Sequence, residues 1–335
     1  MRDAFFSALT AAAERDERVW ALTGDLGIGL FDDFCRVAPG RYLNVGIAEQ
    51  ALVGVAAGLS YAGQRPVAYS IAPFLTARAH EQVRVDVAIA NANVTLVGVG
   101  GGVAYGYLGP THHGTEDIAV MRALPGMTVL APADPGEARR ATEAGLALDG
   151  PVYLRLGKNG EPNLLGDAPF TIGSAVTLAD GGDVVLASTG PVLRQVLAAA
   201  ERLERDGVHP TILHFGTVKP FDTPALTEAA GRAGAVLTVE EHTIVGGLGS
   251  AAAEALAEAG TGARLRRIGL RDTFAHEVGS QAHLLSVHGI TEDQIHAQAL
   301  ELVSAAAKAA DHAPGAAGGA SGAGGENSDG LRVAA

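Results

Sequence analysis

A carboxylate opens an otherwise apolar helix in the first third of the chain. The sequence Asn44-Val-Gly-Ile-Ala-Glu49-Gln leads into a helix of small residues expected over residues 47–62. A helix dipole stabilises negative charge in its first turn. An acid at such a position often does no more than help the helix begin, so Glu49 becomes a candidate only together with what the neighbouring strands carry.

Two further segments follow predicted strands. Phe74 comes after an apolar run at residues 66–70, and the loop Gly109-Pro-Thr-His112-His113-Gly comes after a run at 94–99. Taken singly, the first is typical of a core aromatic and the second of a surface loop, and adjacent histidines point apart, which makes them poor joint metal ligands. In open parallel sheets, however, ligands bind outside the carboxyl ends of the strands, and Glu49, Phe74 and His112 are all expected there.

The elements that must position these residues alternate between short apolar runs and helical stretches, the pattern of βαβ units. Strands are expected at 18–23, 41–45, 66–70, 94–99, 127–131 and 152–156, and helices at 47–62, 74–90 and 134–148. A second set follows, with strands at 183–188, 211–214, 235–239 and 264–268 and helices at 192–206, 223–233, 250–259 and 291–308. The predicted fold class is α/β, with two domains built on parallel or mixed sheets.

Glycine and proline mark the predicted boundaries. The first domain is expected over 1–157, a linker over 158–172 and the second domain over 173–311. Residues 312–335 are rich in Gly, Ala and Ser and are predicted to form a disordered tail.

Composition excludes several classes of partner. There are 24 Lys and Arg residues against 37 Asp and Glu, a net charge of −13, and this field repels nucleic acid and anionic membranes. No apolar run reaches the roughly 18 residues of a membrane span. One cysteine and the lack of a signal-peptide pattern at the start indicate a cytoplasmic protein.

A dinucleotide site is the first alternative to weigh. Gly247-Leu-Gly249-Ser-Ala-Ala252 has the GxGxxA form and opens a predicted helix. Residues 240–246 separate these glycines from the preceding strand, and the acidic residue expected about 20 positions later is missing. The pattern therefore favours a helix start that packs closely on a sheet.

Together these segments resemble the C-terminal section of transketolase, in the form that some organisms make as a separate subunit. The resemblance rests on NVGIAEQ (44–50), FLTARAHEQVRVDVA (74–88), GPTHHGTEDIAVMRALPGMTVLAPAD (109–134) and TVEEHTIVGGLGSAAAEALAE (238–258). It covers about residues 1–305. It implies a pyrimidine-binding domain over 1–157 and a transketolase C-terminal-type domain over 173–311.

The resemblance also implies thiamine diphosphate as the cofactor. Glu49 matches the glutamate that hydrogen-bonds N1′ of the aminopyrimidine, and Phe74 matches the aromatic residue that stacks on that ring. His112 matches a histidine near the reacting carbon, suited to holding substrate hydroxyls and moving protons. Glu49 and His112 are thus the implied catalytic residues. Arg155 matches an arginine that binds the anionic end of a substrate.

Two departures from the family lie beside Phe74. The positions of flanking aromatic residues fall on Ile71 and Ala77. Ile71 and Ala77 are therefore expected to line the cofactor ring, with extra space beside the pyrimidine.

Other departures lie in the expected substrate site. In an ungapped alignment over residues 97–112, Gly100 takes the place of a family histidine, and Tyr107 and Leu108 take the place of an acidic pair that hydrogen-bonds sugar hydroxyls. An unpaired hydroxyl in such a pocket costs roughly 1–3 kcal/mol. The sequence therefore predicts a less hydroxylated or bulkier acceptor than a pentose phosphate.

The family holds its diphosphate and metal with a GDG motif, and no GDG triplet occurs here. The resemblance therefore implies a partner, the N-terminal diphosphate-binding subunit, which would hold Mg²⁺ or Ca²⁺ in an α2β2 assembly. Three functions remain open: a two-component transketolase, a beta-type subunit of a 2-oxo acid decarboxylating or 1-deoxyxylulose-5-phosphate synthase-like enzyme, and a binding subunit that has lost catalysis.

Overall fold

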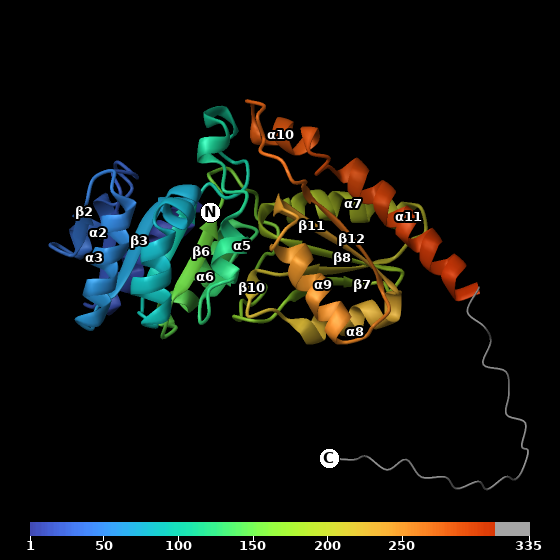
Figure 1. Ribbon diagram of the computed structural model, residues 1–335, viewed down its shortest axis with the longest axis horizontal. Helices are drawn as coiled ribbons and strands as arrows, with labels where there is room; N and C mark the ends of the chain where they lie inside the picture. The colour runs from blue at the N-terminus through green and yellow to red at the C-terminus, as the bar shows by residue number, and fades with distance from the viewer. Residues whose placement is uncertain (312–335) are drawn as a thin grey trace, which may run out of the picture.

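Two β-sheets, each covered by helices on both faces, form the molecule (Figure 1). The computed structural model describes residues 1–311, so the predicted tail over 312–335 lies outside the described residues. The predicted α/β class with two sheets is confirmed.

The first sheet has seven strands in the order β10-β5-β6-β4-β3-β1-β2. Its members are β1 (Val19–Thr23), β2 (Tyr42–Asn44), β3 (Arg65–Ile71), β4 (Thr95–Val99), β5 (Thr128–Leu130), β6 (Val152–Leu156) and β10 (Thr217–Lys219). All neighbouring pairs are parallel except β10 with β5. Parallel strands need crossover connections, and these supply the helices.

Helices pack on both faces of this sheet. They are α1 (Arg2–Arg15), α2 (Asp32–Val37), α3 (Glu49–Tyr61), α5 (Asp117–Arg122) and α6 (Pro135–Ala147). On one face, α1 and α6 pack together over a core that includes Phe5 and Leu154. On the other face, α3 and α5 cover a core that includes Leu52 and Tyr153. Asp134 caps α6 as expected, accepting the Glu137 N–H at 2.7 Å.

One predicted helix is wrong in its form. The segment expected as a single helix over 74–90 is instead a π-helical turn η1 (Phe74–Arg78), a short α4 (His80–Gln82) and a second π-helical stretch η2 (Val83–Ile89). A π turn inserts one extra residue into the helical repeat, and such turns are frequent at functional sites. Here the wide turn carries Phe74 and Arg78.

The second sheet has five strands in the order β12-β11-β8-β9-β7. Its members are β7 (Val176–Asp180), β8 (Val184–Thr189), β9 (Pro210–His214), β11 (Ala235–Thr243) and β12 (Arg264–Leu270). Only the edge pair of β7 with β9 is antiparallel. The helices are α7 (Leu193–Arg205), α8 (Thr223–Ala233), α9 (Leu248–Glu258), α10 (Gln281–Val287) and α11 (Glu292–Asp311). A hydrophobic core lies on each face of this sheet. Helices α7 and α11 pack on one face, and α8 and α9 pack on the other.

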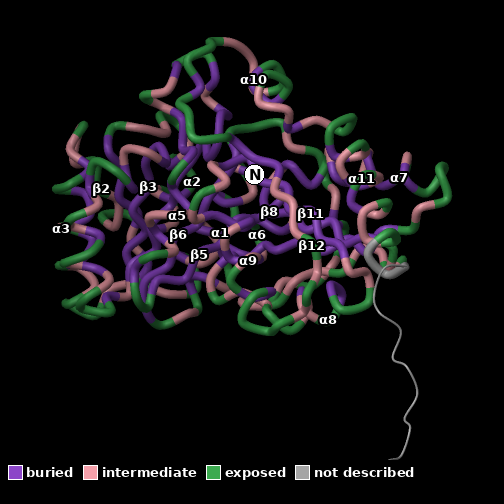
Figure 2. The backbone as a smooth tube through the Cα atoms, turned by 45° about the vertical axis from the view of Figure 1, so that its right-hand side comes forward, coloured by how far each residue is buried: buried purple, intermediate pink, exposed green. Residues whose placement is uncertain are grey.

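The two domains are joined through strand β10. This short strand lies beyond the linker in sequence, yet it pairs with β5 at the edge of the first sheet. Lys219 extends the join by donating to the carbonyl of Arg122 at 2.9 Å. In Figure 2 the buried residues run through the strands of both sheets, whereas the outer helix surfaces are largely exposed.

Candidate active site

Glu49 lies at the first position of α3, at the carboxyl end of the first sheet. Its side chain is 1% exposed. One carboxylate oxygen accepts the Ser70 hydroxyl at 3.0 Å, and the other pairs with the Arg78 guanidinium at 2.6 Å. A buried charge needs such partners, because desolvation strongly disfavours an unpaired carboxylate.

Arg78 is a site residue that the sequence reasoning missed. Its guanidinium carbon lies 4.2 Å from the centre of the Phe74 ring, while its Nη1 pairs with Glu49. The Arg78 side chain is 39% exposed, so it forms the outer wall of the site. Arg78 could have been found from the sequence, because a buried Glu49 requires a cation nearby and the FLTAR segment carries one.

His112 meets another part of the Phe74 ring. The two rings are 5.0 Å apart at 64°, an edge-to-face contact. His112 ends the 3₁₀ turn η4 (Pro110–His112), where its Nδ1 and the Thr111 hydroxyl share a hydrogen bond of 2.9 Å. The structure therefore brings Glu49, Phe74 and His112 together from three strand ends, with Arg78 between Glu49 and the ring.

Gly100 is a glycine for a local packing reason. It has φ +76°, and a Cβ at this position would collide with the Tyr105 ring. A histidine side chain has no room here, because Tyr105 fills the space. Tyr107 and Leu108 form part of the 3₁₀ turn η3 (Gly106–Leu108) and are 71% and 51% exposed.

The two residues expected beside the pyrimidine differ in burial. Ile71 ends β3 and is 6% exposed, within the same core that Phe74 packs against. Ala77 lies exposed on η1. Ile71 therefore belongs to the core on which Phe74 packs, whereas Ala77 is open to solvent.

Arg155, expected as a substrate ligand, lies buried where the two domains meet. It is 4% exposed, and its Nε donates to Asp117 at 2.8 Å. Its Nη2 donates to the carbonyls of Gly114 and Glu241 at 3.0 and 2.9 Å. Since these donors are already used within the chain, the geometry favours a structural role at the contact between the two domains over a substrate ligand.

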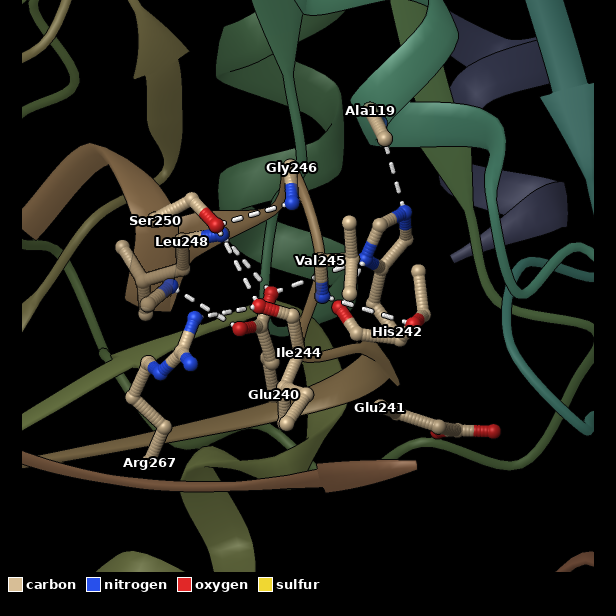
Figure 3. Close-up of polar contacts among 12 residues, drawn as sticks. Ala119, Glu240, Glu241, His242, Ile244, Val245, Gly246, Leu248, Ser250 and Arg267 are labelled. Atoms are coloured by element: carbon tan, nitrogen blue, oxygen red, sulfur yellow. Dashed lines mark hydrogen bonds and ion pairs between the residues drawn. The ribbon is translucent and has the colours of Figure 1, made fainter. Parts of the chain in front are cut away.

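The GxGxxA segment starts α9, and its N-terminus is already filled (Figure 3). Leu248 and Gly249 donate their N–H groups to the buried Glu240 carboxylate at 2.7 and 2.9 Å. A Cβ on Gly247 would collide with the same carboxylate. The glycines therefore make room for Glu240, as expected of a closely packed helix start, and a dinucleotide phosphate has no place there.

Family comparisons agree with this geometry. Residues 1–161 match the transketolase pyrimidine binding domain, and residues 173–295 match the transketolase C-terminal domain. The chain belongs to the transketolase family. The two matched ranges include all the residues of the Glu49 site and strand β11.

Two curated transketolase relatives are similar over most of their length. The 6-deoxy-6-sulfo-D-fructose transketolase subunit SqwH of Clostridium sp. strain MSTE9 is 40% identical over 88% of this chain and 92% of the relative. A subunit of the apulose-4-phosphate transketolase of Phocaeicola vulgatus is 36% identical over 90% of this chain and 97% of the relative.

A solved structure supports the same assignment. A split-gene transketolase, described as an inactive beta4 tetramer, superposes with a TM-score of 0.83 at 35% sequence identity. The match covers 90% of this chain and 98% of that one.

Thiamine diphosphate is the cofactor of the transketolase family, and the residues present fit one half of it. A buried carboxylate acceptor, Glu49, lies beside an aromatic residue, Phe74, as an aminopyrimidine requires. Among residues 1–311, no group of three or more His, Cys, Asp or Glu side chains is arranged to hold a metal ion. The residues present in this chain therefore fit the pyrimidine half of the cofactor.

Nor does any described helix have the length and apolar character needed to cross a membrane.

Burial shifts the pKa values of two side chains on β11, Glu240 and His242, in opposite directions. Burial raises the pKa of the Glu240 carboxyl to about 7, although the N–H groups of Gly249 and Leu248 pull it down. Burial lowers the pKa of His242 to about 4, and the Asp117 carboxylate partly opposes this shift. Both ring nitrogens of His242 are used, Nδ1 toward the Thr243 carbonyl at 2.7 Å and Nε2 toward the Ala119 N–H at 3.3 Å.

Stability should therefore respond to pH oppositely in two variants. Because Glu240 binds its proton more tightly in the folded chain, its contribution to stability is lost as the pH rises from 4.5 to about 7. Because His242 binds its proton less tightly in the folded chain, stability rises as the pH increases from about 4 to 6.5. Between about pH 5 and 7, the free energy of unfolding of Glu240→Gln should rise by about 2 kcal/mol relative to that of the wild type. That of His242→Asn should fall by a similar amount.

Urea unfolding of the wild type and both variants across this pH range measures the effect. Only the change with pH is compared, so a constant loss from the substitution itself does not matter. Parallel curves for all three proteins would contradict the two pKa shifts.

Proposed function

We propose that this chain is the C-terminal subunit of a two-component, thiamine diphosphate-dependent transketolase. The enzyme would transfer a two-carbon ketol unit from a ketose or 2-oxo acid donor to an aldehyde acceptor. The observation that carries the proposal is the buried Glu49 carboxylate, joined through Arg78 to the Phe74 ring, with His112 in contact with the same ring.

Each of these residues has a task that its surroundings suit. Glu49, fixed by Ser70, is a carboxylate acceptor shielded from solvent, and would hold the proton of a ring nitrogen. Phe74 offers a ring face for stacking. His112 is half-buried, and can hydrogen-bond a substrate hydroxyl and exchange its proton. The bound cofactor would supply the electron sink for carbon–carbon bond cleavage.

The diphosphate and its Mg²⁺ would be held by the partner subunit. Support comes from the missing GDG motif and from the solved relative, which is described as an inactive beta4 tetramer. We infer an α2β2 complex with each site between unlike chains, in the cytoplasm.

An apolar surface beside the site suits this partner. It is called the α3–η2 face below and comprises exposed residues before α3 (Ile47), in α3 (Val55 and Tyr61) and in η2 (Val85 and Ile89). Large exposed apolar patches mark interaction sites. Because Ile47 lies two residues before Glu49, a subunit that covered this end of the α3–η2 face would also close the cofactor site.

The substrate proposal rests on the residues near His112. Tyr105 fills the space beside Gly100, and Tyr107 and Leu108 present apolar surface where the family has acids. The two relatives described above are named for a sulfonated sugar and for apulose 4-phosphate. We infer a transketolase of specialised metabolism, with an acceptor less hydroxylated or bulkier than ribose 5-phosphate.

The test is to assemble the chain with its GDG-bearing partner and assay ketol transfer and 2-oxo acid decarboxylation side by side. Hydroxypyruvate serves as donor, and ribose 5-phosphate is compared with short or apolar aldehydes. We expect kcat/KM to be about 10-fold lower for ribose 5-phosphate, because each unpaired hydroxyl is penalised. Ribose 5-phosphate as the best acceptor would refute the substrate proposal, and decarboxylation without transfer would favour the dehydrogenase-like alternative.

A further inference from the structure

The segment that carries His112 is a long loop between β4 and α5. It is called the His112 loop below and comprises residues 100–114. Two backbone hydrogen bonds of 2.8 Å between Gly102 and Gly114 close its base. Between these two glycines the described chain forms only short 3₁₀ turns, so the position of His112 depends on what holds the base and sides of the loop.

A side chain from the C-terminal domain reaches into this base. Glu241 on β11 is 2% exposed, and its Oε1 accepts the Val103 N–H at 2.8 Å. A Cβ on Gly102, which has φ +65°, would collide with the Glu241 side chain. Glu241 therefore touches two consecutive residues of the His112 loop, and a larger residue than glycine could not stand at 102.

Glu241 also binds the start of α10. The Gln281 side-chain nitrogen donates to both Glu241 oxygens, at 2.9 and 2.8 Å. Just before α10, the Gly279 N–H donates to the Gly106 carbonyl at 3.3 Å. Figure 1 shows α10 at the top of the molecule, beside this loop. The His112 loop is thus held at its base by Glu241 and along its side by the segment that Glu241 anchors.

Arg155 completes the connection. Its Nη2 donates both to the Gly114 carbonyl, at the end of the loop, and to the backbone carbonyl of Glu241. The two ends of the His112 loop are therefore attached to the same residue of β11. The hydrogen bonds of Glu49, by contrast, go to Ser70 and Arg78, outside this set.

We propose that Glu241 is a positioning residue of the active site. It fixes the His112 loop from the second domain and so sets where His112 stands relative to Phe74. The catalytic consequence rests on the proposed transketolase function, whereas the mechanical role does not. A misplacement of about 1 Å in a reacting group can lower a rate by about 100-fold.

The neighbouring residue offers a matched control. Glu240 is also a fully buried glutamate on β11, but its carboxylate caps α9 and points in a different direction from the Glu241 side chain (Figure 3). Glu240→Gln disturbs the same strand without touching Val103 or Gln281. Any effect shared by the two positions reports general destabilisation, and an effect confined to Glu241 reports the loop.

The first experiment is hydrogen–deuterium exchange on the full chain without cofactor or partner. In Glu241→Ala the Val103 amide and the other amides of the His112 loop should exchange about 10-fold faster or more. Glu241→Gln should restore most of the protection, because its amide oxygen can accept from Val103 while Gln281 turns its own amide. Glu240→Gln should leave these amides unchanged and speed exchange at Leu248 and Gly249.

The second experiment uses the complex with the partner subunit. Glu241→Ala should lower kcat by about 10- to 100-fold, because His112 shifts relative to Phe74. The Kd of thiamine diphosphate should change by less than about 3-fold, because the Glu49–Arg78 ion pair and the Arg78 contact with the Phe74 ring do not involve Glu241. Gln281→Ala, at a half-buried position on α10, should lower kcat by about 3- to 10-fold. Glu240→Gln should stay within about 2-fold of wild type at neutral pH.

The outcomes separate the two proposals. If the wild-type complex binds thiamine diphosphate but transfers no ketol unit, the proposed function fails, and the exchange experiment still tests Glu241. If the His112 loop keeps wild-type exchange in both Glu241→Ala and Gln281→Ala, the positioning role is wrong. Equal losses of kcat in Glu240→Gln and Glu241→Ala would likewise overturn it.

Discussion

Glu49→Gln, assembled with the partner subunit, should lose at least about 100-fold in ketol transfer while the fold stays intact. The glutamine is isosteric and can still accept from Ser70 or Arg78, but it cannot hold the charge that a protonated ring nitrogen requires. Exchange of the C2 proton of bound thiamine diphosphate, followed by NMR, measures this step separately from substrate turnover.

Ser70→Ala is the control for the Glu49 prediction. It removes one hydrogen bond from a neutral donor and leaves the carboxylate with Arg78. Such a hydrogen bond contributes about 1 kcal/mol, so the loss should stay below about 10-fold. Wild-type C2 proton exchange in Glu49→Gln would show that another residue serves the pyrimidine.

Arg155→Met should destabilise the folded chain by about 3–5 kcal/mol. The substitution leaves the Asp117 carboxylate buried without its cation, and it removes the hydrogen bonds to Gly114 and Glu241. Removing one member of a buried ion pair costs this much because the other charge stays desolvated. The free energy of unfolding in urea, measured at neutral pH, tests the value.

Removing the second charge should restore part of that stability. In Arg155→Met with Asp117→Asn, no uncompensated carboxylate remains, and the asparagine oxygen can still accept the Tyr153 hydroxyl. The alternative role, implied by the family match, is an anion ligand for the substrate. Unchanged stability in Arg155→Met, together with a raised KM for phosphorylated substrates only, would establish that role instead.

The sequence was most informative where one principle decided the structure. Parallel strands end at one edge of a sheet, so the alternation of apolar runs and helices predicted that Glu49, Phe74 and His112 would lie together, and they do. Asp134 before Pro135 determined the start of α6 through a cap and a helix-compatible proline. These signals are local, and tertiary contacts did not change them.

Other features depended on long-range contacts and could not be predicted. Strand β10 has three residues, and only its pairing with β5 across the domain boundary makes it a strand. The helix over 74–90 became two π-helical stretches, which apolar spacing alone cannot distinguish from an α-helix. Helix α1 was missed although Phe5, Leu9 and Ala13 follow a four-residue spacing, a signal that was present in the sequence.

One physical cause explains why the sequence did not point to Arg78 and did not show the buried setting of Arg155. Arg155 and Arg78 are both arginines near the strand ends, and sequence position does not tell which one is buried against an aspartate. In the folded chain, Arg155 pairs with Asp117 and Arg78 pairs with Glu49. Burial, known only from the structure, decides between a structural cation and one that faces the site.

We propose that this chain holds the pyrimidine half of a cofactor site that a second subunit completes. Calorimetric titration with thiamine diphosphate and Mg²⁺ tests it most directly, first on the purified chain and then on its mixture with the GDG-bearing partner. We predict no measurable binding to the chain alone and tight, stoichiometric binding to the mixture. Micromolar binding to the chain alone would contradict the claim.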